Sequence, residues 1–167
     1  DGLRFFAFLT VYVSHGVGYN PYYRQWPEHG FWGFVKAHFL GMGAWGVDFF
    51  FVLSGFLITY LLLTELSATG RLSIARFYMR RVLRIWPAYY LVLLIGFLLL
   101  PALMVKLRPE WAPYDTSVPG AWYLYGFFLA NFDILWNGYH SPALQVVWSV
   151  SVEEQFYLCW PWLVRLR

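Results

Sequence analysis

Long stretches without a charged residue constrain this chain more than any other feature of its sequence. Asp, Glu, Lys and Arg are absent from Phe5 to Tyr23, and again from Ile85 to Val105. A membrane-spanning helix needs about 20 mostly apolar residues, because the hydrocarbon core of a bilayer is roughly 30 Å thick and a helix rises about 1.5 Å per residue. Each stretch is therefore long enough to cross a bilayer as a helix.

The composition places the whole chain in the same class. Of its 167 residues, 60% are hydrophobic, 23% are aromatic and only 13% are charged. Soluble domains carry about 25% charged residues, so these values predict an all-α, polytopic transmembrane helix bundle. We interpret the formal net charge of +3 as a bias of membrane topology rather than as a surface for nucleic acid.

Apolar segments separated by polar or proline-containing connections predict about five membrane helices. The expected ranges are about Leu3–Val17, Ala44–Thr64, Val82–Val105, Ala121–Trp136 and Gln145–Leu166. A shorter interfacial helix is expected at Phe31–Gly43, with Lys36 and His38 facing water. Because the chain begins without Met and ends just after an apolar segment, we expect it to be part of a longer protein.

Two side chains in the first helix do not suit an apolar span. Arg4 lies at its start and His15 lies inside it, 11 positions later. That separation is about three helical turns, so both side chains lie on nearly the same face. Ionisable groups inside membrane helices are costly and by default mark a functional site. The alternative is that Arg4 extends to the interface and His15 only bonds a neighbouring helix.

Carboxylates occur in the second and fifth helices. Asp48 lies near one end of the second helix, where it needs a cation or a hydrogen-bond donor on another helix. Glu153 and Glu154 are adjacent in the fifth helix and project about 100° apart. We favour Glu153 for a position facing a cavity, because it shares a face with Ser149 and Tyr157. Adjacent carboxylates at this depth need a cation partner, a bound proton or a role in proton transfer.

Arginines gather between the second and third helices. They are Arg71, Arg76, Arg80, Arg81 and Arg84. By the positive-inside rule this cluster lies on the cytoplasmic side of the membrane. Arg80 and Arg84 share one helical face, with Arg81 beside them. Because Arg can hold a phosphate through two parallel hydrogen bonds, the cluster is either a phosphate clamp or a contact for anionic lipids.

Four motifs follow one another along almost the whole chain. They read DGLRFFAFLTVYVSHG, GVDFFFVLSGFLI, FYMRRVLRIWPAYY and WSVSVEEQFYL. Together and in this order, they resemble the acyltransferase-3 family of integral membrane acyltransferases. Members of that family are longer than this chain. The resemblance therefore implies a single transmembrane acyltransferase domain over residues 1–167, its N-terminal part only, without the C-terminal helices.

The resemblance also implies a reaction and a location. Family members transfer an acyl group, commonly acetyl, from acyl-CoA to a hydroxyl of a sugar, polysaccharide or related acceptor. The implied partners are membrane lipids, acyl-CoA and a carbohydrate or other hydroxyl acceptor, with no nucleic acid and no metal. The implied location is the bacterial inner membrane, as a multi-pass protein of the cell envelope.

Site residues follow from the same resemblance. The histidine of the opening helix, regarded as catalytic in the family, corresponds to His15, and the arginine paired with it corresponds to Arg4. The basic motif corresponds to Arg80, Arg81 and Arg84, and the acidic motif corresponds to Glu153 and Glu154. Because CoA carries phosphates, this arginine cluster at the cytoplasmic face could hold it.

The side chains themselves are compatible with this chemistry. Acyl transfer to an alcohol needs a base for the hydroxyl proton, and histidine is the side chain that titrates nearest to neutral pH. A carboxylate bonded to the imidazole would orient it, and Asp48, Glu153 or Glu154 could do so. The alternative is a proton-coupled transporter in which His15, Asp48 and Glu153 form a pathway, although no inverted repeat supports it.

Overall fold

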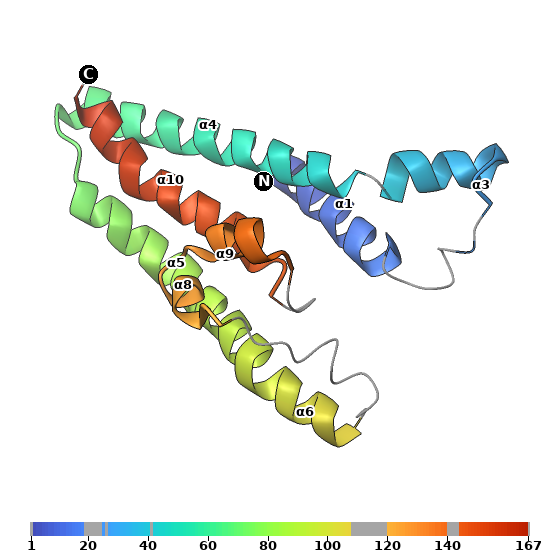
Figure 1. Ribbon diagram of the computed structural model, residues 1–167. Helices are drawn as coiled ribbons and strands as arrows, with labels where there is room; N and C mark the ends of the chain where they lie inside the picture. The colour runs from blue at the N-terminus through green and yellow to red at the C-terminus, as the bar shows by residue number, and fades with distance from the viewer. Residues whose placement is uncertain are drawn as a thin grey trace. The chain divides into compact units, whose positions relative to one another are not determined.

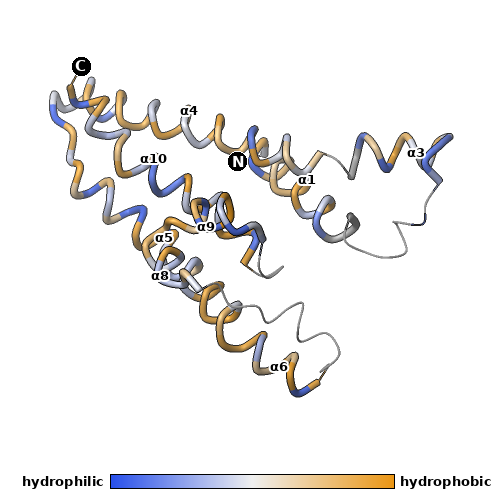
Figure 2. The backbone as a smooth tube through the Cα atoms, viewed as in Figure 1, coloured by the Kyte–Doolittle hydropathy of each residue, from blue (hydrophilic) through white to orange (hydrophobic). Residues whose placement is uncertain are grey.

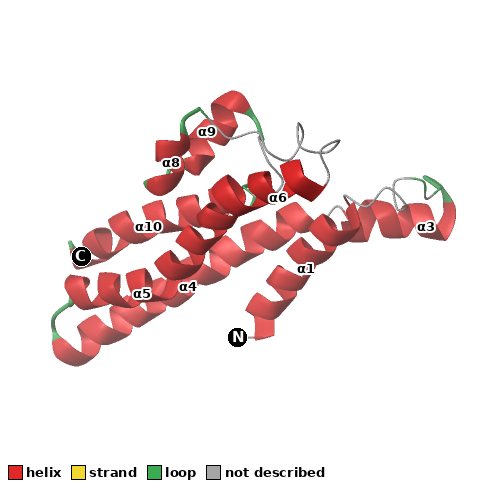
Figure 3. Cartoon of the chain, turned by 90° about the horizontal axis from the view of Figure 1, so that it is seen from below, coloured by secondary structure: helices red, strands yellow, loops and turns green. Residues whose placement is uncertain are grey.

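A computed structural model describes residues 2–18, 25, 27–40, 42–107, 120–139 and 144–166 of the chain. Within these ranges the chain forms helices joined by turns, and no strand occurs (Figure 3). The all-α class predicted from the sequence is therefore confirmed. The chain divides into two compact units, Asp1–Thr64 and Glu65–Arg167.

The first unit contains the predicted opening helix, the interfacial segment and most of the second helix (Figure 1). These elements are α1 (Gly2–Gly18), α3 (Gly30–Val35), the π-helix η1 (Lys36–Leu40) and α4 (Gly43–Thr69). Helix α4 runs beyond the predicted end at Thr64, because Glu65 to Thr69 contain no Gly or Pro that would stop it.

Helix α1 packs antiparallel against α4 at small residues. Gly43 lies against Ser14, and Gly46 lies against Ala7 and Thr10, so positions rise along one helix as they fall along the other. A Cβ atom on Gly46 would stand 2.9 Å from the carbonyl oxygen of Ala7 and would also meet the Thr10 hydroxyl. Glycine is therefore required for this close approach of two helix backbones.

Replacing Gly46 with Ala tests this contact. We expect a loss of roughly 1–3 kcal/mol of stability from overpacking, measured as a lower melting temperature of the detergent-solubilised protein. Gly126→Ala is the matched control, because a Cβ there meets nothing within 4 Å. A second change, Thr10→Ala, should recover part of the loss. Equal melting temperatures for the Gly46 and Gly126 variants would contradict the close packing.

The second unit begins in the last turn of α4. Its elements are α5 (Ile74–Leu94), the π-helix η2 (Ile95–Leu99), α6 (Leu100–Leu107), α8 (Trp122–Gly126), α9 (Ala130–Asn137) and α10 (Val147–Arg165). Helices α5, η2 and α6 form one continuous rod (Figure 1). Their hydropathy changes along the rod, from mixed in the first turns of α5 to mainly hydrophobic towards α6 (Figure 2).

Two further boundaries differ from the sequence prediction. The third helix begins at Ile74 rather than Val82, because the arginine-rich segment between them consists of good helix formers and contains no breaker. The helix predicted at 121–136 is split into α8 and α9, and Phe128 adopts a φ of 57° at the corner. The fifth helix, by contrast, matches α10 closely.

Two helical segments of the described residues are long and apolar enough to cross a membrane. They lie within Gly30–Thr69 and Ile74–Leu107. The expected number of about five membrane helices is therefore not confirmed. Helix α1 has 17 residues, or about 25 Å, and α10 contains the polar run Ser151–Gln155, which lowers its mean hydropathy.

The core of the second unit forms where α5, α8, α9 and α10 meet. Its buried residues are Tyr89, Leu93, Tyr125, Phe128, Ala130, Leu144 and Val147. Outside this core, many large apolar side chains remain exposed, among them Leu83 and Leu98. Exposed apolar surface on this scale is typical of helices that face lipid or further helices.

Candidate functional site

His15 lies in the last turns of α1 with an exposed side chain. Its Nδ1 atom lies 2.9 Å from the carbonyl oxygen of Val11. A carbonyl oxygen can only accept a hydrogen bond, so this contact assigns the proton to Nδ1. In the neutral ring the lone pair is then on Nε2. The bond therefore fixes the tautomer in which Nε2 can take a proton, as a general base must.

Arg4 faces α4 from the other end of α1. Its guanidinium carbon lies 5.9 Å from the centre of the Phe50 ring, within the range of a cation–π contact. The side chain is half-buried, and its Nε atom is buried with no hydrogen-bond partner among the described residues. Contacts within the described residues thus leave part of the hydrogen-bonding capacity of Arg4 unused.

Asp48 lies on a different face of α4 from the residues that meet α1. Gly46 packs against Thr10, and Phe50 lies under Arg4. Asp48 is two positions from each, which is about 200° around the helix, and its side chain is exposed. This geometry argues against Asp48 as the carboxylate that orients His15.

Helices α5 and α10 lie side by side in Figures 1 and 3, and the contacts between them include four pairs of residues spread along both helices. The pairs are Tyr78 with Leu158, Arg81 with Tyr157, Trp86 with Glu154 and Tyr89 with Ser151. In these pairs the residue numbers increase along α5 as they decrease along α10, so the two helices are antiparallel. We refer to these eight residues as the α5–α10 seam.

Glu154 is the buried carboxylate of the α5–α10 seam, with 6% of its surface exposed. Its Oε2 atom accepts a hydrogen bond of 3.3 Å from the indole nitrogen of Trp86. Its Oε1 atom is buried and has no partner among the described residues. Arg81 attracts this carboxylate and the adjacent Glu153 repels it. A buried polar atom without a partner is costly and is a marker of functional sites.

Glu153 is half-buried and accepts a hydrogen bond from the hydroxyl of Tyr157. The shared face predicted for these two residues is therefore present. Ser149, the third residue predicted on that face, donates to the carbonyl of Val146 at 3.0 Å. The carboxylate that contacts α5 is Glu154, whereas the preference for Glu153 as the residue required for activity stays a prediction.

Arg81 contacts aromatic rings of both helices. Its guanidinium carbon lies 5.5 Å from the centre of the Phe77 ring and 5.3 Å from that of Tyr157. The planar guanidinium is well suited to such stacking. Arg81 therefore contributes to the contact between α5 and α10, close to Glu154.

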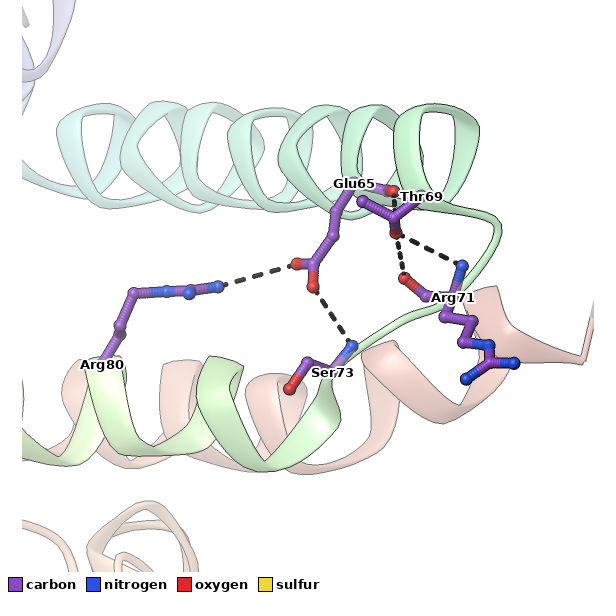
Figure 4. A network of polar contacts seen from close by, with 5 residues as sticks. All are labelled: Glu65, Thr69, Arg71, Ser73 and Arg80. Atoms are coloured by element: carbon purple, nitrogen blue, oxygen red, sulfur yellow. Dashed lines mark hydrogen bonds and ion pairs between the residues drawn. The ribbon is translucent and has the colours of Figure 1, made fainter.

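Arg80 and Arg84 both lie on the exposed side of α5, and we call them the arginine face. The Nη2 atom of Arg80 lies 3.8 Å from Oε2 of Glu65 (Figure 4). An exposed pair at this distance contributes about 0–1 kcal/mol. Arg80 is therefore only weakly held, and both arginines can reach a ligand of opposite charge.

Glu65 also fixes the turn that precedes α5. Its Oε1 atom accepts the backbone N–H of Ser73 at 3.2 Å (Figure 4). The side chain of Ser73 makes no capping bond itself, so Glu65 supplies the negative group that stabilises a helix N-terminus. Gly70 turns the chain with a φ of 66°, and the Thr69 hydroxyl accepts the N–H of Arg71 at 3.3 Å.

The described residues contain no group of three His, Cys, Asp or Glu side chains that could hold a metal ion. The candidate groups named above include an imidazole, carboxylates and guanidinium groups. These are groups for proton transfer and for binding anions.

Comparison with known proteins agrees with the four sequence motifs. A family model described as an acyltransferase domain, that of the acyltransferase-3 family, matches residues 1–167. The chain belongs to the acyltransferase-3 family. The resemblance identified from the sequence is therefore confirmed, over the full length of the chain. No solved structure matches the chain.

Several relatives of this acyltransferase-3 chain are named O-acetyltransferases. The O-acetyltransferase OatA of Staphylococcus aureus is 30% identical over 168 residues, covering 98% of this chain and 24% of that protein. The peptidoglycan O-acetyltransferase OatA of Listeria monocytogenes is 33% identical, covering 96% and 23%. The putative peptidoglycan O-acetyltransferase YrhL of Bacillus subtilis is 34% identical, covering 96% and 22%. The chain therefore spans about a quarter of the length of these relatives.

Sequence reasoning missed the partner of Glu154 in this family member. Trp86 lies 68 positions away from Glu154, and no local spacing connects two residues at that separation. It also missed the role of Glu65 at the start of α5. A signal did exist for Glu65, because a carboxylate eight residues before a helix start can reach it across a short turn.

Glutamine variants of the acidic pair separate the two carboxylates. We expect Glu154→Gln to lower acyl transfer far more than Glu153→Gln, because only Glu154 faces α5 with a buried second oxygen. Activity is measured in membranes that contain equal amounts of each protein. Full activity of both variants would remove the pair from the mechanism, and a loss confined to Glu153→Gln would support the preference drawn from the sequence.

Proposed function

We propose that the protein is an integral membrane O-acyltransferase that moves an acetyl group to a hydroxyl of a cell-wall carbohydrate. Membership of the acyltransferase-3 family and the names of its relatives support this reaction. The observation in the structure that supports it is the distance of 2.9 Å between Nδ1 of His15 and the carbonyl oxygen of Val11, which favours the tautomer with Nε2 as the base. The comparisons give no support to the transporter alternative, which we do not carry further.

The proposed reaction is transfer from a thioester to an alcohol. Nε2 of His15 takes the hydroxyl proton as the hydroxyl oxygen attacks the acyl carbon. A carbon–oxygen bond forms, the carbon–sulfur bond of the thioester breaks, and the leaving thiolate takes up the proton. Arg4 supports the same face of α1 through its contact with Phe50. Asp48 stays a weaker candidate for orienting His15, for the geometric reason given above.

The second unit is proposed to bind the acyl donor. We propose acyl-CoA as that donor, held through its phosphates by the arginine face, Arg80 and Arg84, in the cytoplasmic half of a bacterial inner membrane protein. Arg81, which already contacts the rings of Phe77 and Tyr157, would support the position of this surface on α5. Glu154 is proposed to be required for turnover.

Substitution of His15 tests the proposed base. A general base contributes about 10²–10⁴-fold to a rate, so His15→Gln should lose activity by about that factor while the protein still accumulates. Glutamine can keep the bond to Val11 but cannot take a proton. The assay follows acetyl ester formation on carbohydrate with saturating donor and acceptor.

His38→Gln is the matched control for the His15 variant. Its Nδ1 bonds the carbonyl of Phe34 at 3.0 Å, four residues earlier, in the same way as His15. We expect the His38 variant to keep wild-type turnover. Near-normal turnover of His15→Gln would show that His15 is a packing residue and would overturn the proposed mechanism.

Substitution of Arg84 tests the proposed donor site. Arg84→Ala should raise the apparent KM for acyl-CoA more than that for the acceptor, and Arg84→Lys should rescue it only in part, because Lys lacks the planar fork. Arg71→Ala removes the same charge from the same cluster but outside the arginine face, and serves as the control. Equal changes in both alanine variants would indicate a general contact with anionic lipid.

A further inference from the structure

We propose that Trp86 is a positioning residue for Glu154. Its indole N–H donates a hydrogen bond to Oε2 of Glu154. Oε1 of Glu154 is then the carboxylate oxygen that takes part in the reaction. This inference rests on the proposed function, in which Glu154 is required for turnover. It assigns a role to a residue that lies outside the acidic pair, on the facing helix of the α5–α10 seam.

The two oxygens of Glu154 are in different situations. Oε2 accepts the Trp86 N–H at 3.3 Å, and Oε1 is buried with no partner among the described residues. A carboxylate with both oxygens free could rotate about its terminal torsion, which has a broad energy profile. One bond from a rigid indole on the neighbouring helix restricts that rotation. The other oxygen is then held in a single direction.

Trp86 is itself supported by the corner between α8 and α9. The Phe128 ring lies 5.5 Å from the Trp86 ring, tilted by 38°, and stacks on Tyr89 at 4.2 Å. Phe128 is the one non-glycine residue with a positive φ in the part of the chain that the structure describes. A bulky residue in this conformation is strained, and it persists only where its surroundings hold it.

The group that holds this corner is the neighbour of Glu154. Gln155 donates from Nε2 to the carbonyl of Phe128 at 2.8 Å and to the Oδ1 atom of Asn131 at 2.8 Å. The contacts therefore close on themselves: Glu154 bonds Trp86, Trp86 packs on Phe128, and Phe128 is bonded to Gln155. A closed set of contacts fixes the direction of a side chain better than a single bond does.

The Trp86 N–H is not needed to align α5 with α10, because other contacts of the α5–α10 seam do so. Tyr78 donates to the carbonyl of Leu158 at 2.7 Å, and Tyr89 is hydrogen-bonded to Ser151 at 3.4 Å. These contacts already align the two helices on either side of Trp86. Phenylalanine in place of Trp86 would keep most of the packing and would remove only the donor.

The test compares two indole donors that join the same two helices. Trp86→Phe removes the N–H bond to Glu154, and Trp162→Phe removes the N–H bond of 2.9 Å to Tyr78. In the full-length protein in membranes, Trp86→Phe should lower kcat roughly 10–100-fold, the factor that corresponds to a hydrogen bond to a charged group. The KM for the acyl donor should stay unchanged. Trp162→Phe should keep the wild-type kcat.

Glu154→Gln completes a double-mutant cycle with each variant. Trp86→Phe should cause little further loss of residual activity in the Glu154→Gln background, whereas any effect of Trp162→Phe should be additive. Phe128→Leu, which keeps the donor but loosens its support, should lower kcat less and in the same direction. Phe128→Leu replaces Trp86→Phe in the test if the Trp86→Phe protein does not accumulate.

Each result decides between the two proposals. If Trp86→Phe keeps the wild-type kcat while Glu154→Gln is impaired, the role of Trp86 is overturned and the proposed function stays intact. The same holds for Phe128→Leu if it replaces Trp86→Phe in the test. An effect of Trp86→Phe that is equally large in the Glu154→Gln background also overturns it, because Trp86 would then act through packing. Full activity of Glu154→Gln overturns the use of Glu154 in the proposed function, and the role of Trp86 with it.

Discussion

The burial of one carboxylate between α5 and α10 is the constraint on which the second unit depends. Glu154 has little exposed surface, and an ionisable group in such a place needs donors or a nearby cation. Helix α5 supplies both, as Trp86 and Arg81. The antiparallel register of the α5–α10 seam follows from these pairings as much as from apolar packing.

In the first unit, two apolar helices, α1 and α4, lie close together without a polar contact at every turn. Gly43 and Gly46 allow α1 to lie directly on the backbone of α4, as small residues do in membrane helix pairs. His15 comes one position after Ser14, which faces Gly43, so it lies at the margin of this contact and stays exposed. Packing thus fixes the helix while the imidazole remains accessible.

Local patterns in the sequence predicted the helical class, the positions of α1, α4 and α10, the family, and the face shared by Glu153 and Tyr157. They failed where distant residues decide. The corner at Phe128 breaks a helix in an aromatic segment, because Gln155 and Tyr89 from two other helices hold it. Spacing within α10 alone also does not show which side of that helix meets α5, so the contact of Glu154 with Trp86 was not predicted.

One carboxylate, Glu65, takes part in both the first turn of α5 and the arginine face. It accepts the Ser73 N–H and lies near Arg80 (Figure 4). An anion that binds Arg80 competes with this carboxylate, and by thermodynamic linkage the competition acts equally in both directions. A donor bound to the arginine face, as proposed, would therefore compete for Arg80 with the same side chain that accepts the backbone N–H of Ser73 just before α5.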